Sequence, residues 1–348
     1  MQHQLNHKMA PDPSPFIVAE MSANHNNSID RALEIVRVAA ESGVHAIKLQ
    51  TYTADTLTIE SKKHDFLIED QKSLWRDQYL YDLYQKAHTP WEWHKPIFDR
   101  ARELGIVAFS TPFDTTAVDF LEELDCPIYK IASFEIVDLL LIKKIAQTGK
   151  PIIMSTGMAT VAEIDEAVRT IRAEGNNQIT LLKCTSTYPA SPTDSNLRTI
   201  SHLRELFNCE VGLSDHTLGI GVAVAAVALG ATVIEKHFTL SRAEGGVDAA
   251  FSMEPQEMKM LVEETQRAWQ ALGKVHYGPT EAEKKSLVYR RSLYFVKDMS
   301  AGDVITPDCI RSIRPGYGLP PKYFDSLLGI AIRKNVKAGT PVSFDVLK

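Results

Sequence analysis

Residues 211–238 read VGLSDHTLGIGVAVAAVALGATVIEKHF. Two short apolar runs in this segment, 211–216 and 233–238, have the character of β-strands, and one helix-length apolar stretch separates them. A strand, a helix and a second strand in this order place the two strands parallel and side by side. His216 and His237 end the two runs, so we expect both imidazoles at one edge of the sheet. Two converging imidazoles can begin a divalent-metal site; the alternative is two ordinary histidines hydrogen-bonded near a core.

The same alternation of apolar runs and helical segments continues over most of the chain. Helix starts are marked by the capping box of Thr160 and Glu163, and by Thr89 with Glu92, where Pro90 is predicted as the first helical residue. The predicted strands are 16–22, 46–50, 107–112, 129–133, 151–156, 179–185, 211–216 and 233–238. Eight strands alternating with helices predict an α/β fold, a (β/α)₈ TIM barrel. The rival, a doubly wound sheet, lacks a G-x-G-x-x-G motif after its first strand.

Changes in sequence pattern predict the domain boundaries. The polar, Pro-rich residues 1–14 are expected to form a flexible leader, and residues 15–278 the barrel. A charged linker is predicted over 279–287. Residues 288–348 hold short β-like stretches broken by Gly and Pro, which predict a compact, irregular β domain. Because so small a domain has a marginal core of its own, we expect it to dock on another surface.

Composition excludes several classes of protein. The 348 residues have a net charge of −6, and 44% are hydrophobic and 24% charged, which is ordinary for a globular protein and gives no basic footprint for nucleic acid. The most apolar stretch, 222–234, is too short to span a membrane. Four scattered cysteines without a CxxC pair favour a reduced, cytoplasmic setting. We therefore expect partners that are neither nucleic acid nor membrane.

Polar side chains gather where the predicted strands end, which is where a barrel places its reactive groups. Lys48 and Lys130 could hold anions such as a phosphate and a carboxylate, together with the hydroxyls of Ser133, Ser155 and Ser214. The alternative for each lysine is a salt bridge to one of three glutamates, Glu20, Glu135 or Glu235. Glu20 is also a candidate general base or water-positioning group.

The connection after the second predicted strand, residues 51–88, is long, polar and rich in aromatic residues. Long loops in compact domains are usually functional or disordered, and aromatic content favours a function. A lid or sugar-contacting loop is one interpretation. The other is a satellite hydrophobic cluster that packs on the outside of the barrel.

Several motifs at these strand ends resemble those of the sialic acid synthases, a family that condenses phosphoenolpyruvate with an acylated amino sugar. The resemblance covers nearly the whole chain, and residues 313–318, Ile-Arg-Pro-Gly-Tyr-Gly, are similar to the antifreeze-protein-like (SAF, β-clip) domain of these enzymes. The motifs are AEMSANHN at 19–26, IKLQT at 47–51, FSTPFD at 109–114, YKIAS at 129–133, STGM at 155–158, GLSDH at 212–216 and EKHF at 235–238.

The resemblance implies a role for each matching residue. His216 and His237 would bind Mn²⁺ or Mg²⁺, and the acid–base and charged catalytic groups would be Glu20, Lys48, Lys130 and Glu135. Phosphoenolpyruvate would contact Lys48, Thr111, Lys130, Ser133, Ser155 and Ser214, and the sugar would face Gln50, Ser186, Tyr188 and Asp248. Arg314 would reach from the tail domain into the barrel of a second subunit in a domain-swapped homodimer.

Within the family the chain is most similar to the branch that makes pseudaminic acid from 2,4-diacetamido-2,4,6-trideoxy-L-altrose. The cues are SANHN at 22–26, LYDLY at 80–84, HTPWEW at 88–93 and CTSTYP at 184–189, and Ser186 stands where neuraminate synthases generally carry Asn. Synthesis of neuraminic or legionaminic acid is the first alternative. A sugar-binding barrel without activity is the second, and the complete ring of polar residues argues against it.

Overall fold

The computed structural model describes residues 14–71 and 73–347, so the predicted leader over 1–14 lies almost entirely outside the described residues. The chain divides into two compact units between Gly273 and Lys274. The first contains every strand of a closed barrel, and the second holds a separate two-stranded sheet. The predicted fold, a TIM barrel followed by a small β domain, is confirmed.

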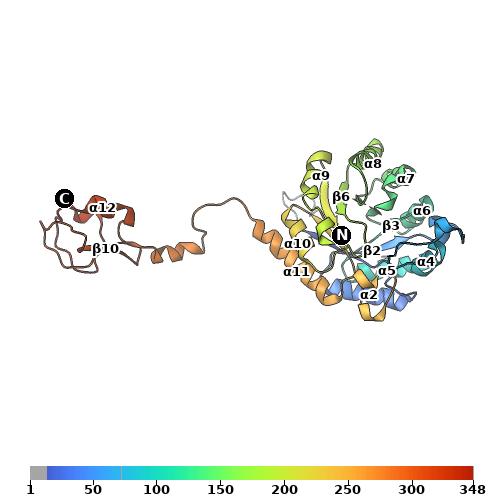
Figure 1. Ribbon diagram of the computed structural model, residues 1–348, viewed down its shortest axis with the longest axis horizontal. Coiled ribbons are helices and arrows are strands. Elements are labelled where there is room, and N and C mark those ends of the chain that lie inside the picture. The colour runs from blue at the N-terminus through green and yellow to red at the C-terminus, as the bar shows by residue number, and fades with distance from the viewer. Residues whose placement is uncertain (1–13, 72, 348) are drawn as a thin grey trace. The chain divides into compact units, whose positions relative to one another are not determined.

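Eight parallel strands close the barrel, because β1 pairs with both β2 and β8 (Figure 1). The strands are β1 (Phe16–Glu20), β2 (Ala46–Thr51), β3 (Val107–Pro112), β4 (Tyr129–Ile131), β5 (Ile152–Ser155), β6 (Ile179–Cys184), β7 (Glu210–Ser214) and β8 (Val233–His237). Every residue of β3 is buried, as expected for a strand covered on both faces. Parallel closure brings all the carboxyl ends to one rim, which is where the candidate site lies.

Helices surround the strands (Figure 1). They are α2 (Ile29–Glu41), α3 (Ala54–Leu57), α4 (Leu80–Ala87), α5 (Trp91–Glu103), α6 (Thr115–Glu123), α7 (Leu139–Gln147), α8 (Val161–Ala173), α9 (Thr199–Phe207), α10 (Gly221–Ala228) and α11 (Pro255–Leu272). The capping box predicted for Thr160 and Glu163 is present at the start of α8. The one predicted at Thr89 is wrong: Pro90 is the N-cap of α5 and has no side-chain cap. The Thr89 hydroxyl lies 3.2 Å from His25 Nε2 instead.

The second unit is built around an antiparallel pair, β9 (Ser292–Phe295) and β10 (Ile310–Ile313), with one short helix, α12 (Phe324–Leu327). Its small core includes Leu293, Phe295 and Ile332, each at most 1% exposed. A 3₁₀ helix over Glu283–Tyr289 covers part of the predicted linker. The division after Gly273 comes before the predicted end of the barrel at residue 278.

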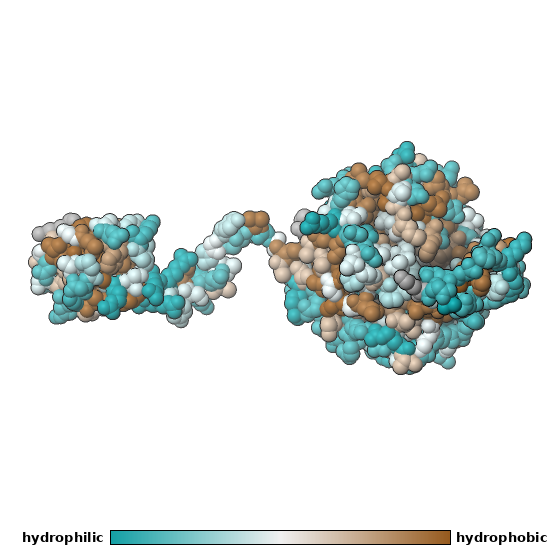
Figure 2. All heavy atoms as spheres, viewed as in Figure 1, coloured by the Kyte–Doolittle hydropathy of each residue, from teal (hydrophilic) through white to brown (hydrophobic). Residues whose placement is uncertain are grey.

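Figure 2 shows hydrophobic residues exposed among the hydrophilic surface of the barrel unit. Large exposed hydrophobic side chains of this unit include Phe134 and Leu140, which follow β4, and Met158, which follows β5. Among the described residues, no helix combines the length and the hydropathy that crossing a membrane requires.

Candidate active site

Four charged side chains meet inside the carboxyl end of the barrel. Lys48 on β2 forms an ion pair with Glu20 on β1, and its Nζ lies 3.8 Å from Glu235 Oε1 on β8. The Nζ of Lys130 on β4 lies 3.8 Å from the same Glu235 oxygen. All four residues are at most 5% exposed. Burial of unpaired charge is costly, so two ammonium groups facing two carboxylates form a cluster in which charge is balanced.

The pKa values of this cluster follow from burial and from the neighbouring charges. Burial raises the pKa of Glu20, and the nearby Glu235 adds to that effect while Lys48 opposes it. Burial alone would lower the pKa of Lys48, but the facing carboxylates of Glu20 and Glu235 raise it above its ordinary value. For Lys130 burial prevails and the pKa is lowered. Burial acts to raise the pKa of Glu235, but the two lysines outweigh it and the pKa is lowered.

Hydroxyl groups surround the two lysines. Lys48 donates a hydrogen bond to Thr111 Oγ1 at 3.2 Å, and Lys130 donates one to Ser155 Oγ at 2.7 Å. The Ser214 hydroxyl donates to Glu235 Oε1 at 3.4 Å. The structure therefore brings together most of the predicted anion-binding set. The alternative prediction, that the lysines form salt bridges with glutamates, also holds, because Lys48 contacts Glu20 and both lysines lie near Glu235. A bound anion would share the lysines with these carboxylates.

Ser133 and Ser186 lie on either side of Gly157, which follows β5. The Gly157 N–H donates to Ser133 Oγ at 3.1 Å. A Cβ built on Gly157 would stand 2.2 Å from Ser186 Oγ and 2.7 Å from Ser133 Oγ. The loops that follow β4, β5 and β6 can therefore approach one another this closely only because residue 157 has no side chain.

The two histidines predicted as metal ligands face each other, with ring centroids 5.4 Å apart. His216 Nδ1 lies 2.9 Å from the Thr185 carbonyl oxygen, which can only accept, so Nδ1 is the donor and Nε2 is the nitrogen that a metal would bind when the ring is neutral. His237 Nδ1 is buried without a hydrogen-bond partner. Burial, followed by the charge of His216, holds the pKa of His237 well below its ordinary value, which keeps this imidazole neutral.

These observations fit a divalent metal held by two protein ligands. An unpaired buried nitrogen is rare in folded proteins, and a metal would satisfy it. Among the residues that the structure describes, no group of three or more His, Cys, Asp or Glu side chains is placed to hold an ion. Two protein ligands would leave positions for water or substrate, as in the open arrangement of catalytic metal sites.

A buried ion pair lies directly beside these histidines in the sequence. Lys236 Nζ lies 2.8 Å from Asp215 Oδ2, both side chains are 1% exposed, and the same ammonium donates to the Thr217 carbonyl at 2.6 Å. The other oxygen of Asp215 accepts from the Thr217 N–H at 2.9 Å. This pair joins the end of β7 to β8, so it positions the backbone that carries His216 and His237.

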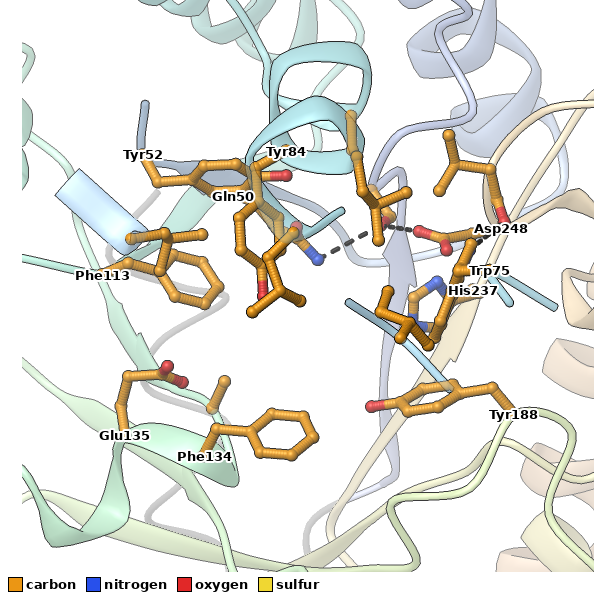
Figure 3. Close-up of a pocket in the computed structure, with 18 of the residues that line it drawn as sticks. Gln50, Tyr52, Trp75, Tyr84, Phe113, Phe134, Glu135, Tyr188, His237 and Asp248 are labelled. Atoms are coloured by element: carbon orange, nitrogen blue, oxygen red, sulfur yellow. Dashed lines mark hydrogen bonds between the residues drawn. The ribbon is translucent and has the colours of Figure 1, made fainter. Parts of the chain in front are cut away.

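A cavity of about 440 Å³ opens next to His237 (Figure 3). Its polar side contains Ser22, Gln50, Tyr188 and Asp248. Asp248 accepts a hydrogen bond from the Ser22 hydroxyl, which in turn accepts one from Gln50 Nε2 at 3.2 Å. Three of the four residues predicted to face the sugar, Gln50, Tyr188 and Asp248, therefore line one cavity. The fourth, Ser186, is not part of its lining.

The long connection after β2 builds one wall of this cavity. Leu57, Ile68, Trp75, Leu80, Leu83, Tyr84 and Ala87 all belong to the lining. Trp75 Nε1 donates to the Val247 carbonyl at 2.9 Å, and its ring centroid lies 5.7 Å from that of Tyr188. These contacts favour the first interpretation of residues 51–88, a loop at the site, over a cluster on the outside of the barrel.

Glu135 lies on the cavity wall, and burial raises its pKa to about 7. Arg314 lies in the second unit, after β10. The predicted site set omits Glu235, although a signal for it exists: it stands two residues before His237 on the same strand, and therefore on the same face. Cys184 is also missing from that set. Burial acts to raise the pKa of its thiol, but the neighbouring His216 lowers it to about 7.

Comparisons with known proteins bear on this geometry. Residues 35–277 match the NeuB family, and residues 290–348 match the SAF domain. The chain belongs to the NeuB family. The resemblance indicated by the strand-end motifs is thereby confirmed.

NeuB-family relatives match along nearly their whole length. A pseudaminic acid synthase of Helicobacter pylori is 46% identical over 95% of this chain and 97% of its own. A pseudaminic acid synthase of Campylobacter jejuni is 44% identical over 94% of this chain and 95% of its own. The crystal structure of an N-acetylneuraminic acid synthetase from Leptospira borgpetersenii, in complex with citrate, matches with a TM-score of 0.70 and 32% identity over 80% of this chain and 91% of that one. This NeuB-family chain is therefore an enzyme, a synthase.

Proposed function

We propose that this enzyme condenses phosphoenolpyruvate with 2,4-diacetamido-2,4,6-trideoxy-L-altrose to give pseudaminic acid and phosphate. The observation that carries the proposal is the junction of a lysine and hydroxyl cluster with a sugar-sized cavity, in a chain 46% identical to a pseudaminic acid synthase. His237 lies where the two regions meet, since it lines the cavity and shares β8 with Glu235.

Phosphoenolpyruvate would bind at the buried lysine cluster. Lys48 and Lys130 supply the positive charge, and hydroxyls from the ends of β3, β4, β5 and β7 supply hydrogen bonds: Thr111, Ser133, Ser155 and Ser214. Because Glu20 and Glu235 already balance the lysines, a multiply charged anion would bind best when one carboxyl is protonated or when a cation lies nearby.

His216 and His237 would hold Mn²⁺ or Mg²⁺ beside this cluster. Such an ion supplies Lewis-acid polarisation of a carbonyl oxygen when it is bound. The two imidazoles are suited to hold it because the Thr185 carbonyl fixes the tautomer of His216 and burial keeps His237 neutral.

The chain's own residues account for the proton transfers. The C2–C3 π electrons of phosphoenolpyruvate form the bond from carbon 3 to the aldehyde carbon and leave an oxocarbenium ion at carbon 2, and the alkoxide oxygen that results takes a proton from Glu135. Glu135 suits this role because its pKa is about 7 and one of its carboxyl oxygens is buried without a partner. Water then adds at carbon 2 and gives its proton to Glu20. The C–O bond to phosphate then breaks, phosphate leaves with the bonding electrons and takes the proton of the carbon 2 hydroxyl, and a ketone remains at carbon 2.

The enzyme would act as a homodimer in the cytoplasm, with Arg314 of one subunit completing the barrel site of the other. Support for a covered rim comes from large apolar side chains exposed there, Phe134, Leu140 and Met158 at 59%, 80% and 64%. All four cysteines are free, which suits a reducing compartment.

The test is phosphate release by the purified chain with phosphoenolpyruvate, Mn²⁺ or Mg²⁺ and one sugar at a time. We expect release with the diacetamido trideoxy sugar and little with N-acetylmannosamine or the legionaminic acid precursor. If phosphate release is greater with either of these sugars, the enzyme is instead the synthase that uses that sugar. Sugar binding by calorimetry without any turnover would favour the non-catalytic alternative.

A further inference from the structure

The side of the cavity away from His237 and Asp248 is mainly apolar and aromatic, and it also carries the Glu135 carboxyl (Figure 3). We call it the aromatic chamber and define it by Tyr52, Leu83, Tyr84 and Phe113. The ring centroid of Tyr52 lies 5.9 Å from that of Tyr84 and 5.2 Å from that of Phe113, and both pairs meet edge to face. Tyr52 follows β2, Tyr84 and Leu83 belong to α4, and Phe113 follows β3, so three separate segments build this wall.

Two phenol hydroxyls in the chamber lack a protein partner. Tyr52 is 3% exposed, and within the described residues neither its hydroxyl nor that of Tyr84 forms a hydrogen bond. Buried tyrosines usually find a partner. Tyr129 does so here, donating to Glu122 at 2.6 Å. Burial raises the pKa of both Tyr52 and Tyr84, so each hydroxyl is a neutral hydrogen-bond donor that faces an open cavity.

This combination of groups selects one ligand chemistry. Methyl groups can pack against the aromatic faces and Leu83, and burial of each methyl contributes about 0.8 kcal/mol to binding. A sugar hydroxyl can also accept from a phenol, but it brings no methyl group to the apolar wall, whereas an acetamido group brings both an acceptor carbonyl and a methyl. An N-acetyl group, which joins an amide to a methyl, satisfies both features of the chamber.

We propose that the aromatic chamber is the subsite that determines sugar specificity, and that Tyr52 and Tyr84 hold the 4-acetamido group while Leu83 and Phe113 pack on methyl groups. This inference rests on the proposed function, because the sugar's aldehyde end is placed at His216 and His237. The far end, with its second acetamido group and its deoxygenated carbon 6, then enters the chamber. A sugar with hydroxyls at both positions leaves Leu83 and Phe113 without methyl groups to bury.

The test pairs each change in the protein with a change in the sugar. Tyr52→Phe and Tyr84→Phe each remove one hydroxyl, and an analogue of the sugar with hydrogen in place of the 4-acetamido group removes its partner. With the full sugar, we expect each variant to raise the sugar KM roughly five- to tenfold while kcat and the KM for phosphoenolpyruvate stay unchanged. With the analogue, the variants and the parent enzyme should have equal sugar KM values.

Tyr81→Phe is the matched control. Tyr81 lies on the same helix, but its hydroxyl donates to Asp55 at 3.2 Å and it does not line the cavity. We expect it to leave every kinetic constant unchanged. The inference is overturned if Tyr52→Phe and Tyr84→Phe keep the parent KM for the full sugar, or raise it equally for the analogue. If the parent enzyme does not turn over the full sugar at all, the proposed function itself has failed.

Discussion

Replacing Gly157 by alanine is expected to disable the enzyme without unfolding it. The added Cβ would stand 2.2 Å from Ser186 Oγ and 2.7 Å from Ser133 Oγ, and real Cβ atoms essentially never come closer than 3.0 Å to another heavy atom. The nearer hydroxyl must therefore withdraw or rotate by about 1 Å, a displacement that can cost about 100-fold in rate when it occurs at a catalytic site. We expect kcat/KM for phosphoenolpyruvate to fall by about that factor.

Phosphate release at varied phosphoenolpyruvate, with a thermal melt beside it, measures this effect. The melt separates a local displacement from general loss of structure. Gly221→Ala is the matched control, because a Cβ there meets nothing within 4 Å and the residue begins α10. It should keep full activity. If Gly157→Ala keeps kcat/KM within about twofold of the parent value and folds normally, Ser133 and Ser186 are not held where the reaction needs them.

Three further predictions concern charge and metal. Glu135 is the proposed acid and its pKa is about 7, so kcat should fall as pH rises through that value, and Glu135→Gln should lower kcat and abolish the inflection in the pH profile. Because the pKa of Glu135 is raised in the folded state, the free energy of unfolding of the parent chain should fall as pH rises from 4.5 to about 7. Urea titrations of the Gln variant should not show this fall. Lys236→Met leaves the buried Asp215 carboxylate unpaired and should lower the free energy of unfolding by about 3–5 kcal/mol, while adding Asp215→Leu should recover part of this loss. Chelation by EDTA should abolish phosphate release and Mn²⁺ should restore it. His237→Gln should weaken Mn²⁺ binding by at least about tenfold in calorimetry, and unchanged binding would remove this residue from the ligand set.

The strands were predictable because each is a short apolar run buried on both faces. The predicted run 107–112 coincides with β3, and predicted boundaries elsewhere differ by one or two residues. The fourth strand is shorter than predicted and ends at Ile131, because Ser133 already has helical backbone angles and leads into a 3₁₀ helix over Phe134–Val137. The capping box at Thr89 failed for a tertiary reason, since the Thr89 hydroxyl contacts His25 across the fold.

The two histidines were the most predictable part of the site. His216 and His237 each end an apolar run, and the two parallel strands of a βαβ unit place both residues at one rim. The role of the lysines was harder to predict from the sequence, since whether a lysine binds an anion or a glutamate depends on contacts across the barrel. Lys48 and Lys130 share Glu235, which is far from both in the sequence.

The amino-acid sequence by itself determined the barrel, the second unit and the polar character of the rim, because hydrophobic period and strand-end residues are local properties of the chain. Only the tertiary structure decided which polar groups meet. Ser22 donates to Asp248 across 226 residues, and Tyr52 meets Tyr84 and Phe113 from separate segments. The physical reason is closure: when eight strands form a ring, residues distant in sequence share one small interior, and their pairing depends on register and on the space left between side chains.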